Sequence, residues 1–402
     1  MLNMDSIKNL VDYDFKNEAP WKDVRTETDP ILKFRRYRNN NADKDSNIKF
    51  DCDNSNGTCS LTDSIYSRLW GWSYESRNKI PSQISKSLSE RWGYFGSDTM
   101  NSFATTYSQA TKIYNGDVEK TNHNAFLRRF ASLTHSVGNF TLVPVLLNGS
   151  DQKSFNQYRG YNSENGKYFV YDYFDLSLKL IKESTDSATF ESYIDTFYLN
   201  DYVDENYNII PLFKGHKEIL KEENISLANP DRFLPKNEAE LNEYLKNVIK
   251  AIESRGRTIV LELEKKDPAY TTSLQGKINA KLEIVMSKVK NKATSLLQKI
   301  KGALKVFFAE TLVVSFFFLL LTILAPTVGS PNPLFNYHQS YSYYEIFSYF
   351  MPALNLLVVS AFIASFLLIV RPRFFDRLYN WFKFNQCPYC YKMFSKKLKT
   401  KP

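Results

Sequence analysis

Residues 306–328 read VFFAETLVVSFFFLLLTILAPTV, and residues 346–370 read IFSYFMPALNLLVVSAFIASFLLIV. Each run exceeds the ~20 residues that a helix needs to cross a hydrocarbon core of about 30 Å. No charged residue occurs from Thr311 to Tyr344 or from Ile346 to Val370. We therefore predict two transmembrane helices, 306–328 and 346–370, which are joined by an external loop over 329–345.

Basic residues flank the two runs and set their orientation. Residues 281–305 hold seven Lys and one Glu, and residues 371–402 hold nine Lys or Arg and one Asp. The connecting loop holds neither Lys nor Arg. Because positive charge gathers on the cytoplasmic side, the pattern predicts a hairpin in the plasma (inner) membrane. Both chain ends, including a basic tail over 371–402, would be cytoplasmic, with the lipid bilayer as a partner.

The remaining chain has the composition of a globular domain. Of the 402 residues, 43% are hydrophobic and 24% are charged, and four Cys are too few for a disulfide-stapled scaffold. Residues 1–280 hold 36 Lys or Arg and 39 Asp or Glu, so the net charge of +9 comes from the flanks of the hairpin. This distribution does not favour nucleic acid as a partner. We predict a mostly α cytosolic domain with minor β over residues 1–266.

Local patterns predict several elements of this domain. DYFDLSLKLIKES (172–184) and NEAELNEYLKNVIKAIESRG (237–256) have the helical period, and Gly256 is a stop signal for the second helix. The stretch 97–114 predicts a helix with Ser97 as its N-cap. FTLVPVLL (140–147) is apolar and β-branched, but Pro144 restricts it to an edge or irregular strand.

A basic amphipathic helical neck is predicted over residues 267–305. Its apolar positions are spaced by 4, 4 and 3 residues, an eleven-residue repeat, and lysines accompany them. No Gly or Pro interrupts the pattern between Gly276 and Gly302, so the helix is free to continue into the first span. The apolar stripe comprises Leu274, Ile278, Leu282, Val285, Val289, Ala293, Leu296, Ile300 and Leu304; the lysines are Lys277, Lys281, Lys288, Lys292 and Lys299.

The stripe leaves three alternatives open. In the first, the stripe forms a coiled coil between copies, so that the chain self-associates through 274–304. In the second, it packs on the chain's own cytosolic domain. In the third, it lies on an anionic leaflet as a basic amphipathic helix.

Cysteines are the candidate metal ligands. Cys387 and Cys390 form a CPYC motif, and two thiolates at this spacing provide half of a tetrahedral zinc site. Cys52 and Cys59, or a second chain, would complete that site. The alternatives are a dithiol like that of glutaredoxins, whose βαβ context is missing here, and unliganded reduced cysteines. The sequence shows no phosphate loop and no GxSxG or HExxH motif, and it predicts no cofactor other than this zinc.

Four residues are candidates for catalysis. Asp172 and Asp175 are three residues apart, so one helix face can present both carboxylates for acid–base chemistry or for Mg²⁺. The alternatives are a solvated face and a pair with Arg159. His135, in LTHSVGNF, is a candidate base or a buried structural histidine.

Six phrases between residues 50 and 216 carry a resemblance. They are FDCD (50–53), YSRLW (66–70), GYFGSDTM (93–100), THSVGNFTLVP (134–144), FNQYRG (155–160) and YDYFDLSLKLI (171–181). In this order they resemble an uncharacterised bacterial family of unknown function, whose members carry an LW helix, an SD turn, a TIGG-to-FP segment, an N-x-x-RG step and a DRFDLTL helix. The chain departs from that series at Gly138-Asn139 and Asp172-Tyr173. The family has no assigned activity, so the resemblance supplies no function.

A weaker similarity joins HSVGNFTLVP, Asn148 and Phe155 to the distal part of HNH-type nuclease domains from modification-dependent restriction systems. Those domains carry an earlier histidine motif. The only upstream histidine is His123, in TNHNAF, which lacks that form, so the catalytic half is missing.

Two classes of function remain. In the first, which we favour, the cytosolic domain senses or binds a ligand and is coupled to the membrane hairpin, by analogy with defence-type sensor/effector proteins. In the second, the chain is a membrane-tethered enzyme, for example a degenerate HNH-like nuclease.

Overall fold

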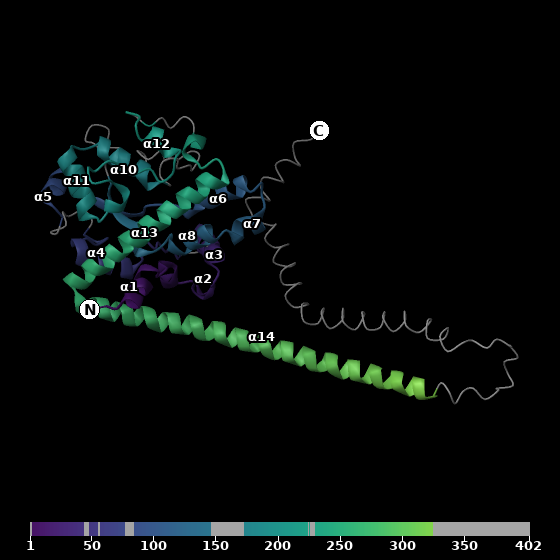
Figure 1. Ribbon diagram of the computed structural model, residues 1–402. Coiled ribbons are helices and arrows are strands. Elements are labelled where there is room, and N and C mark those ends of the chain that lie inside the picture. The colour runs from purple at the N-terminus through teal and green to yellow at the C-terminus, as the bar shows by residue number, and fades with distance from the viewer. Residues whose placement is uncertain are drawn as a thin grey trace, which may run out of the picture. The chain divides into compact units, whose positions relative to one another are not determined.

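The computed structural model describes residues 2–43, 48–54, 57–76, 84–145, 173–223, 225 and 230–324. The chain divides into two compact units, Met1–Glu283 (unit 1) and Ile284–Pro402 (unit 2). Unit 1 is mostly helical and contains a small two-stranded sheet (Figure 1). The predicted mostly α fold with minor β is confirmed.

The helices of unit 1 are mostly short, and the last of them is the longest. In chain order they are α1 (Met4–Val11), η1 (Phe15–Glu18), α2 (Lys22–Thr26), α3 (Pro30–Ala42), α4 (Ser60–Trp70), α5 (Lys86–Arg91), α6 (Phe103–Ile113), α7 (Val118–His123), α8 (Ala125–Leu133), η2 (Val137–Asn139), α10 (Phe174–Glu183), α11 (Ser187–Thr196), η3 (Asn200–Tyr202), α12 (His216–Ile219), η4 (Pro230–Phe233) and α13 (Glu238–Lys266).

Helix α13 organises the core of unit 1. It crosses the unit diagonally in Figure 1 and packs against α1, α4, α8, η2 and η3. Residues at helical spacing along it, such as Leu241, Leu245, Val248, Ile252 and Ile259, are buried. The long periodic segment that the sequence marks as a helix is therefore the central element of the unit.

Gly256 does not end this helix, so the predicted stop signal is wrong. Helix α13 continues to Lys266. A Cβ atom on Gly138, in η2, would lie 2.0 Å from the carbonyl oxygen of Ile252, and one on Gly256 would lie 3.0 Å from Cγ1 of Val11. Gly256 thus permits the close approach of η2 and α1 to α13, which is a packing role and not a termination role.

The sheet pairs β1 (Phe95–Thr99) with β2 (Phe140–Pro144) in antiparallel register, Phe95 opposite Pro144 and Thr99 opposite Phe140. The strand predicted from FTLVPVLL is confirmed, and it ends at the proline. The predicted N-cap at Ser97 is wrong. Ser97 lies within β1, where its hydroxyl donates to the carbonyl oxygen of Asp53 and is hydrogen-bonded to the Tyr66 hydroxyl. The helix begins later, at Phe103, after Ser102.

Helix α14 (Pro268–Leu324) is continuous through the predicted neck and includes residues 306–324 of the first predicted span. Among the described residues, no helix is long and apolar enough to cross a membrane. Residues 325–402 lie outside the described residues. They include the end of the first span, the loop, the second span and the basic tail, so the hairpin stays a prediction.

Candidate functional site: the seat of helix α14

Helix α14 begins at a turn that Asp267 fixes. The backbone N–H of Tyr270 donates to Asp267 Oδ1 at 2.9 Å, and Pro268 occupies the first helical position, where its missing N–H costs nothing. The N–H of Tyr270 and the Arg68 guanidinium hold the pKa of Asp267 below its usual value. Arg68 Nε is 2.9 Å from Asp267 Oδ2, and its guanidinium carbon lies 3.6 Å from the centroid of the Tyr270 ring. Helix α4 therefore holds the first turn of α14.

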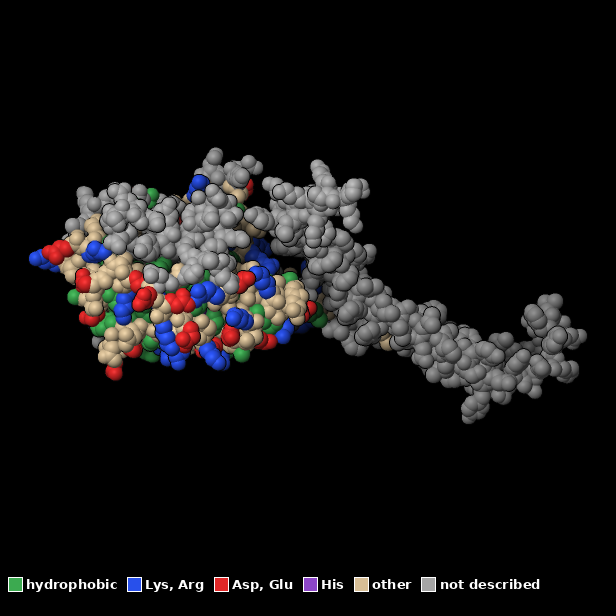
Figure 2. All heavy atoms as spheres, turned by 90° about the horizontal axis from the view of Figure 1, so that it is seen from above, with side chains coloured by type: hydrophobic (Ala, Val, Ile, Leu, Met, Phe, Trp, Pro, Cys, Tyr) green, Lys and Arg blue, Asp and Glu red, His purple; other side chains and the backbone are tan. Residues whose placement is uncertain are grey.

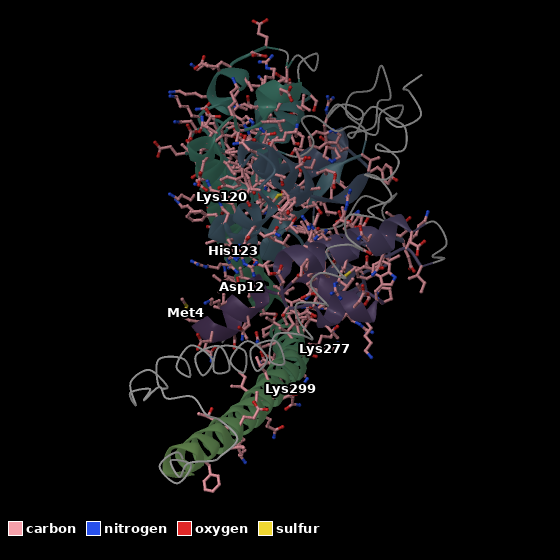
Figure 3. All side chains as sticks on the ribbon, turned by 90° about the vertical axis from the view of Figure 1, so that its right-hand side faces the viewer. Met4, Asp12, Lys120, His123, Lys277 and Lys299 are labelled. Carbon is pink, nitrogen blue, oxygen red and sulfur yellow. The ribbon has the colours of Figure 1, made fainter. Side chains whose placement is uncertain are left out.

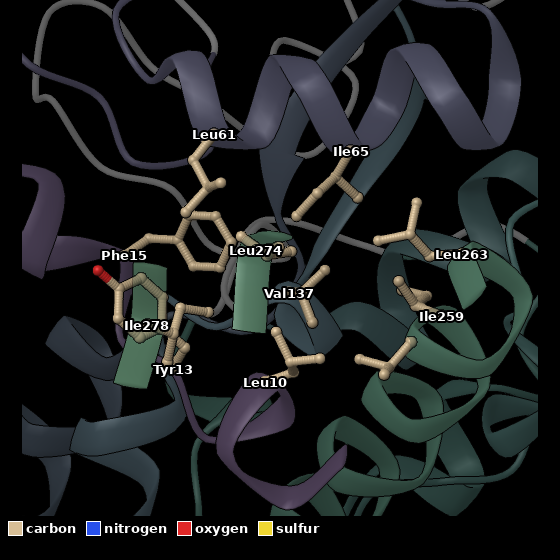
Figure 4. A pocket seen from close by; sticks show the side chains of 11 residues that line it. Leu10, Tyr13, Phe15, Leu61, Ile65, Val137, Ile259, Leu263, Leu274 and Ile278 are labelled. Atoms are coloured by element: carbon tan, nitrogen blue, oxygen red, sulfur yellow. The ribbon is translucent and has the colours of Figure 1, made fainter. Parts of the chain in front are cut away.

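The next turns of α14 enter an apolar pocket of unit 1. Leu274 and Ile278, one turn apart, are only 3% and 2% exposed. Figure 4 shows both among side chains from α1, α4, α13 and the segment before η1. We call this pocket the seat; besides those two residues it is lined by Leu10, Tyr13, Phe15, Leu61, Ile65, Val137, Ile259, Val260 and Leu263.

Polar contacts border the seat. The Glu18 carboxylate accepts hydrogen bonds from Tyr13 Oη and from Lys281 Nζ of α14. Burial, followed by the hydrogen bond to Glu18, raises the pKa of the Tyr13 phenol. At the other end, the backbone N–H of Leu2 donates to Glu264 Oε1 at 2.6 Å. The first turns of α14 are thus held by apolar burial together with the charged hydrogen bond from Lys281, and the Leu2 contact holds the end of α13.

A mostly buried polar group adjoins the seat along the chain, and we call it the interior cluster: Asp14, Lys16, Lys33 and His135. Lys16 is fully buried, and its Nζ lies 3.1 Å from Asp14 Oδ1 and 3.1 Å from His135 Nδ1. Lys33 Nζ is 4.0 Å from Asp14 Oδ2. The cluster is joined to the seat by the chain itself, because Phe15 lies between Asp14 and Lys16.

His135, a predicted catalytic candidate, is buried inside this cluster. Its ring packs on Phe34, Tyr37 and Phe140. Burial lowers its pKa well below the usual value, and the Lys16 ammonium lowers it further. The ring is therefore neutral, and Nδ1 accepts a hydrogen bond from Lys16. This is the structural alternative stated for His135, with Lys16 as a partner 119 residues away in sequence.

Asp175, the second described candidate, is fully buried at the start of α10. Its Oδ2 accepts the N–H of Leu212 at 2.9 Å and lies 2.7 Å from Nδ1 of His216. Nε2 of His216 donates to the carbonyl oxygen of Phe233 at 3.0 Å. The carboxylate thus connects α10 to α12 and η4, and it is not presented on an exposed helix face. Arg159 and Asp172 lie outside the described residues.

The described cysteines are buried thiols. Cys52 and Cys59 are free, and burial raises the pKa of both. Thr62 Oγ1 donates to the carbonyl oxygen of Cys52 at 2.7 Å and lies 3.3 Å from Cys59 Sγ, within reach of the thiol proton. Within the described ranges, no group of three or more His, Cys, Asp or Glu is placed to hold a metal ion. Cys387 and Cys390 lie outside those ranges, so the zinc site stays a prediction.

Sequence reasoning missed three residues that the structure makes central: Asp14, Lys16 and His216. Each is an ordinary polar residue in its local sequence. The partner of His216 lies 41 residues away along the chain, and the His135 partner of Lys16 lies 119 residues away. The available signal was that segment 13–16, YDFK, alternates aromatic and charged residues.

Comparison with known protein families, with curated proteins and with solved structures finds no match to this chain. The resemblance to the uncharacterised family and the similarity to HNH-type domains stay predictions.

Proposed function

We propose that this chain is a membrane-anchored bacterial sensor/effector, in which unit 1 binds a ligand and α14 passes the bound state to the C-terminal hairpin. One observation carries the proposal. Helix α14 starts in the seat, with Leu274 and Ile278 buried, and continues without interruption to Leu324, inside the apolar run that begins at residue 306. A continuous helix that begins against the core of unit 1 and extends into the apolar run is a suitable carrier of a conformational signal.

The arrangement of segment 13–18 supports this coupling. Tyr13 and Phe15 line the seat, and Glu18 pairs with Lys281. Asp14 and Lys16 belong to the interior cluster. A ligand that displaces the interior cluster would therefore move side chains that contact α14.

The geometry of the described candidates does not favour the enzyme alternative. His135 and Asp175 are buried and hydrogen-bonded to protein partners. A general base must reach the proton that it removes. These two residues support the fold of unit 1, and neither faces the surface.

Membrane fractionation and membrane potential test the proposal. The full chain is compared in bacteria with a chain that ends at Glu283, which keeps Leu274 and Ile278 in the seat. We expect the full chain to resist carbonate extraction from membranes and to depolarise the cell, and the shortened chain to do neither. A full chain that washes off contradicts the anchor, and a shortened chain that depolarises contradicts the effector role of the hairpin.

A second arm tests the coupling through the seat. The full chain with Leu274→Ala and Ile278→Ala should stay in the membrane and lose depolarisation, because the anchor is intact and the seat is not. The matched control carries Thr272→Ala and Ser273→Ala, two exposed positions of the same helix. Depolarisation that survives in the seat variant contradicts transmission through α14.

A further inference from the structure

Three lysines lie immediately before the apolar run of α14: Lys299, Lys301 and Lys305, which we call the lysine collar. All three are exposed. At about 100° per residue, Lys301 and Lys305 share one face of the helix and Lys299 lies on roughly the opposite side, so positive charge is present on two sides of the helix. Lys299 precedes residue 306 by seven positions, which is about 10 Å along an α-helix.

No acidic residue lies within four positions of the collar along the chain. No Asp or Glu occurs between Glu283 and Glu310. This differs from Lys281, one turn after the seat, whose ammonium pairs with Glu18. Three exposed ammonium groups without a nearby carboxylate in their own segment can attract a partner that carries negative charge.

The residues that follow the collar indicate what that partner is. Val313 and Phe316, in the next turns of α14, are 56% and 59% exposed. Positive charge on two sides of the helix, followed within about three turns by exposed apolar side chains with Glu310 between them, matches the boundary between anionic headgroups and acyl chains. A polyanion such as nucleic acid would leave those apolar side chains in water. Lys299 and Lys305 are about 9 Å apart along the helix, comparable with the Debye length of about 8 Å in physiological salt, so the three charges would act together on nearby anionic groups.

We propose that the lysine collar binds the headgroups of anionic phospholipids at the cytoplasmic face of the membrane. The inference rests on the proposed membrane attachment for its location. It adds that the chain selects anionic lipids. Attachment through apolar residues alone does not require such selection.

Lipid retention by the full chain tests the collar. The chain in detergent micelles is mixed with equal amounts of phosphatidylglycerol and phosphatidylcholine that have the same acyl chains, and native mass spectrometry measures the ratio of the two lipids retained. We expect phosphatidylglycerol to exceed phosphatidylcholine by about five-fold or more. The variant with Lys299→Gln, Lys301→Gln and Lys305→Gln should bring the ratio close to about one.

A matched control changes the net charge by the same amount elsewhere. Lys8, Lys250 and Lys277 are exposed in unit 1, and Lys277 is on α14 itself (Figure 3). The variant Lys8→Gln, Lys250→Gln and Lys277→Gln should keep the wild-type lipid ratio. Equal loss in both variants would show an effect of net charge and would overturn the proposal, as would an unchanged ratio in the collar variant.

Two further outcomes separate this proposal from its alternatives. Carbonate extraction of the collar variant from bacterial membranes reports on the anchor alone. If the collar variant resists extraction as the wild type does, while its lipid ratio falls, both proposals hold. If the ratio stays high in the variant, only the lipid proposal fails. Displacement of phosphatidylglycerol by inorganic phosphate would show a free-anion site and would overturn the assignment to lipid.

Discussion

At the residue scale, a buried charged side chain joins distant segments of unit 1. Arg255 of α13 is fully buried, and its guanidinium donates to the carbonyl oxygens of Gly138 at 2.9 Å, Phe140 at 2.6 Å and Phe197 at 3.1 Å. Burial lowers its pKa. One side chain thus connects η2, β2 and the end of α11 to the central helix.

The variant Arg255→Leu should destabilise unit 1 by about 3 kcal/mol or more, because it leaves several buried carbonyl groups without donors. Urea unfolding followed by circular dichroism measures the loss. Arg257→Leu, two residues along and exposed, is the matched control and should change the free energy of unfolding by less than about 0.5 kcal/mol. Equal effects of the two variants would contradict the role given to Arg255.

His135 predicts a pH dependence whose sign follows from its lowered pKa. The folded state keeps the ring neutral, whereas the unfolded state takes up a proton below about pH 6.5. Acid therefore stabilises the unfolded state, and the free energy of unfolding should fall by up to about 1.4 kcal/mol per pH unit between pH 6 and 5. Urea unfolding at several pH values measures this slope.

The variant His135→Gln should flatten the slope in that pH window, because glutamine does not titrate. His123→Gln, at an exposed position, is the control and should keep the wild-type slope. A steep slope that persists without His135 would assign the effect to another group.

At the element scale, the sequence predicted the type of an element better than its ends. The helical period of 237–256 correctly indicated a long helix, because a buried face repeats along it. Its end was wrong, since Gly256 is required by η2, more than 100 residues earlier. Ser97 was wrong for the same kind of reason: the hydroxyl has a partner in Asp53, far along the chain. Tertiary contacts override local cap signals, and no local pattern reveals them.

Two glycines have opposite roles: Gly138 allows a close backbone approach, whereas Gly276 only lowers the helix propensity of α14. Gly138→Ala should cost about 1–3 kcal/mol of stability, because its Cβ would overlap the carbonyl oxygen of Ile252. Gly276→Ala should stabilise unit 1 by about 1 kcal/mol, because it lies within α14 and a Cβ there meets nothing within 4 Å. Thermal unfolding of both variants measures the difference. A stabilising Gly138→Ala would contradict the close approach of η2 to α13.

At the whole-molecule scale, surface charge and the neck show how far composition predicts organisation. On the described part of the face in Figure 2, basic and acidic side chains are intermixed, in keeping with the near balance of charge in residues 1–280. The neck was predicted as a helix, and α14 is one. Of its three alternatives, packing on the chain's own domain describes Leu274 and Ile278. The sequence left that choice open because the repeat continues unchanged past them, while only the folded domain provides the seat.

The seat makes a prediction about where unit 1 ends. A chain that stops at Asp267 lacks Leu274 and Ile278, and each buried aliphatic side chain contributes about 1.5–3 kcal/mol. The chain ending at Glu283 should therefore be more stable than the chain ending at Asp267 by about 3–6 kcal/mol, measured by urea unfolding. The Glu283 chain with Leu274→Asn and Ile278→Asn should fall to the stability of the shorter chain. Equal free energies of unfolding for the two lengths would mean that burial of Leu274 and Ile278 adds no stability to unit 1. The interior cluster would then not be energetically coupled to α14.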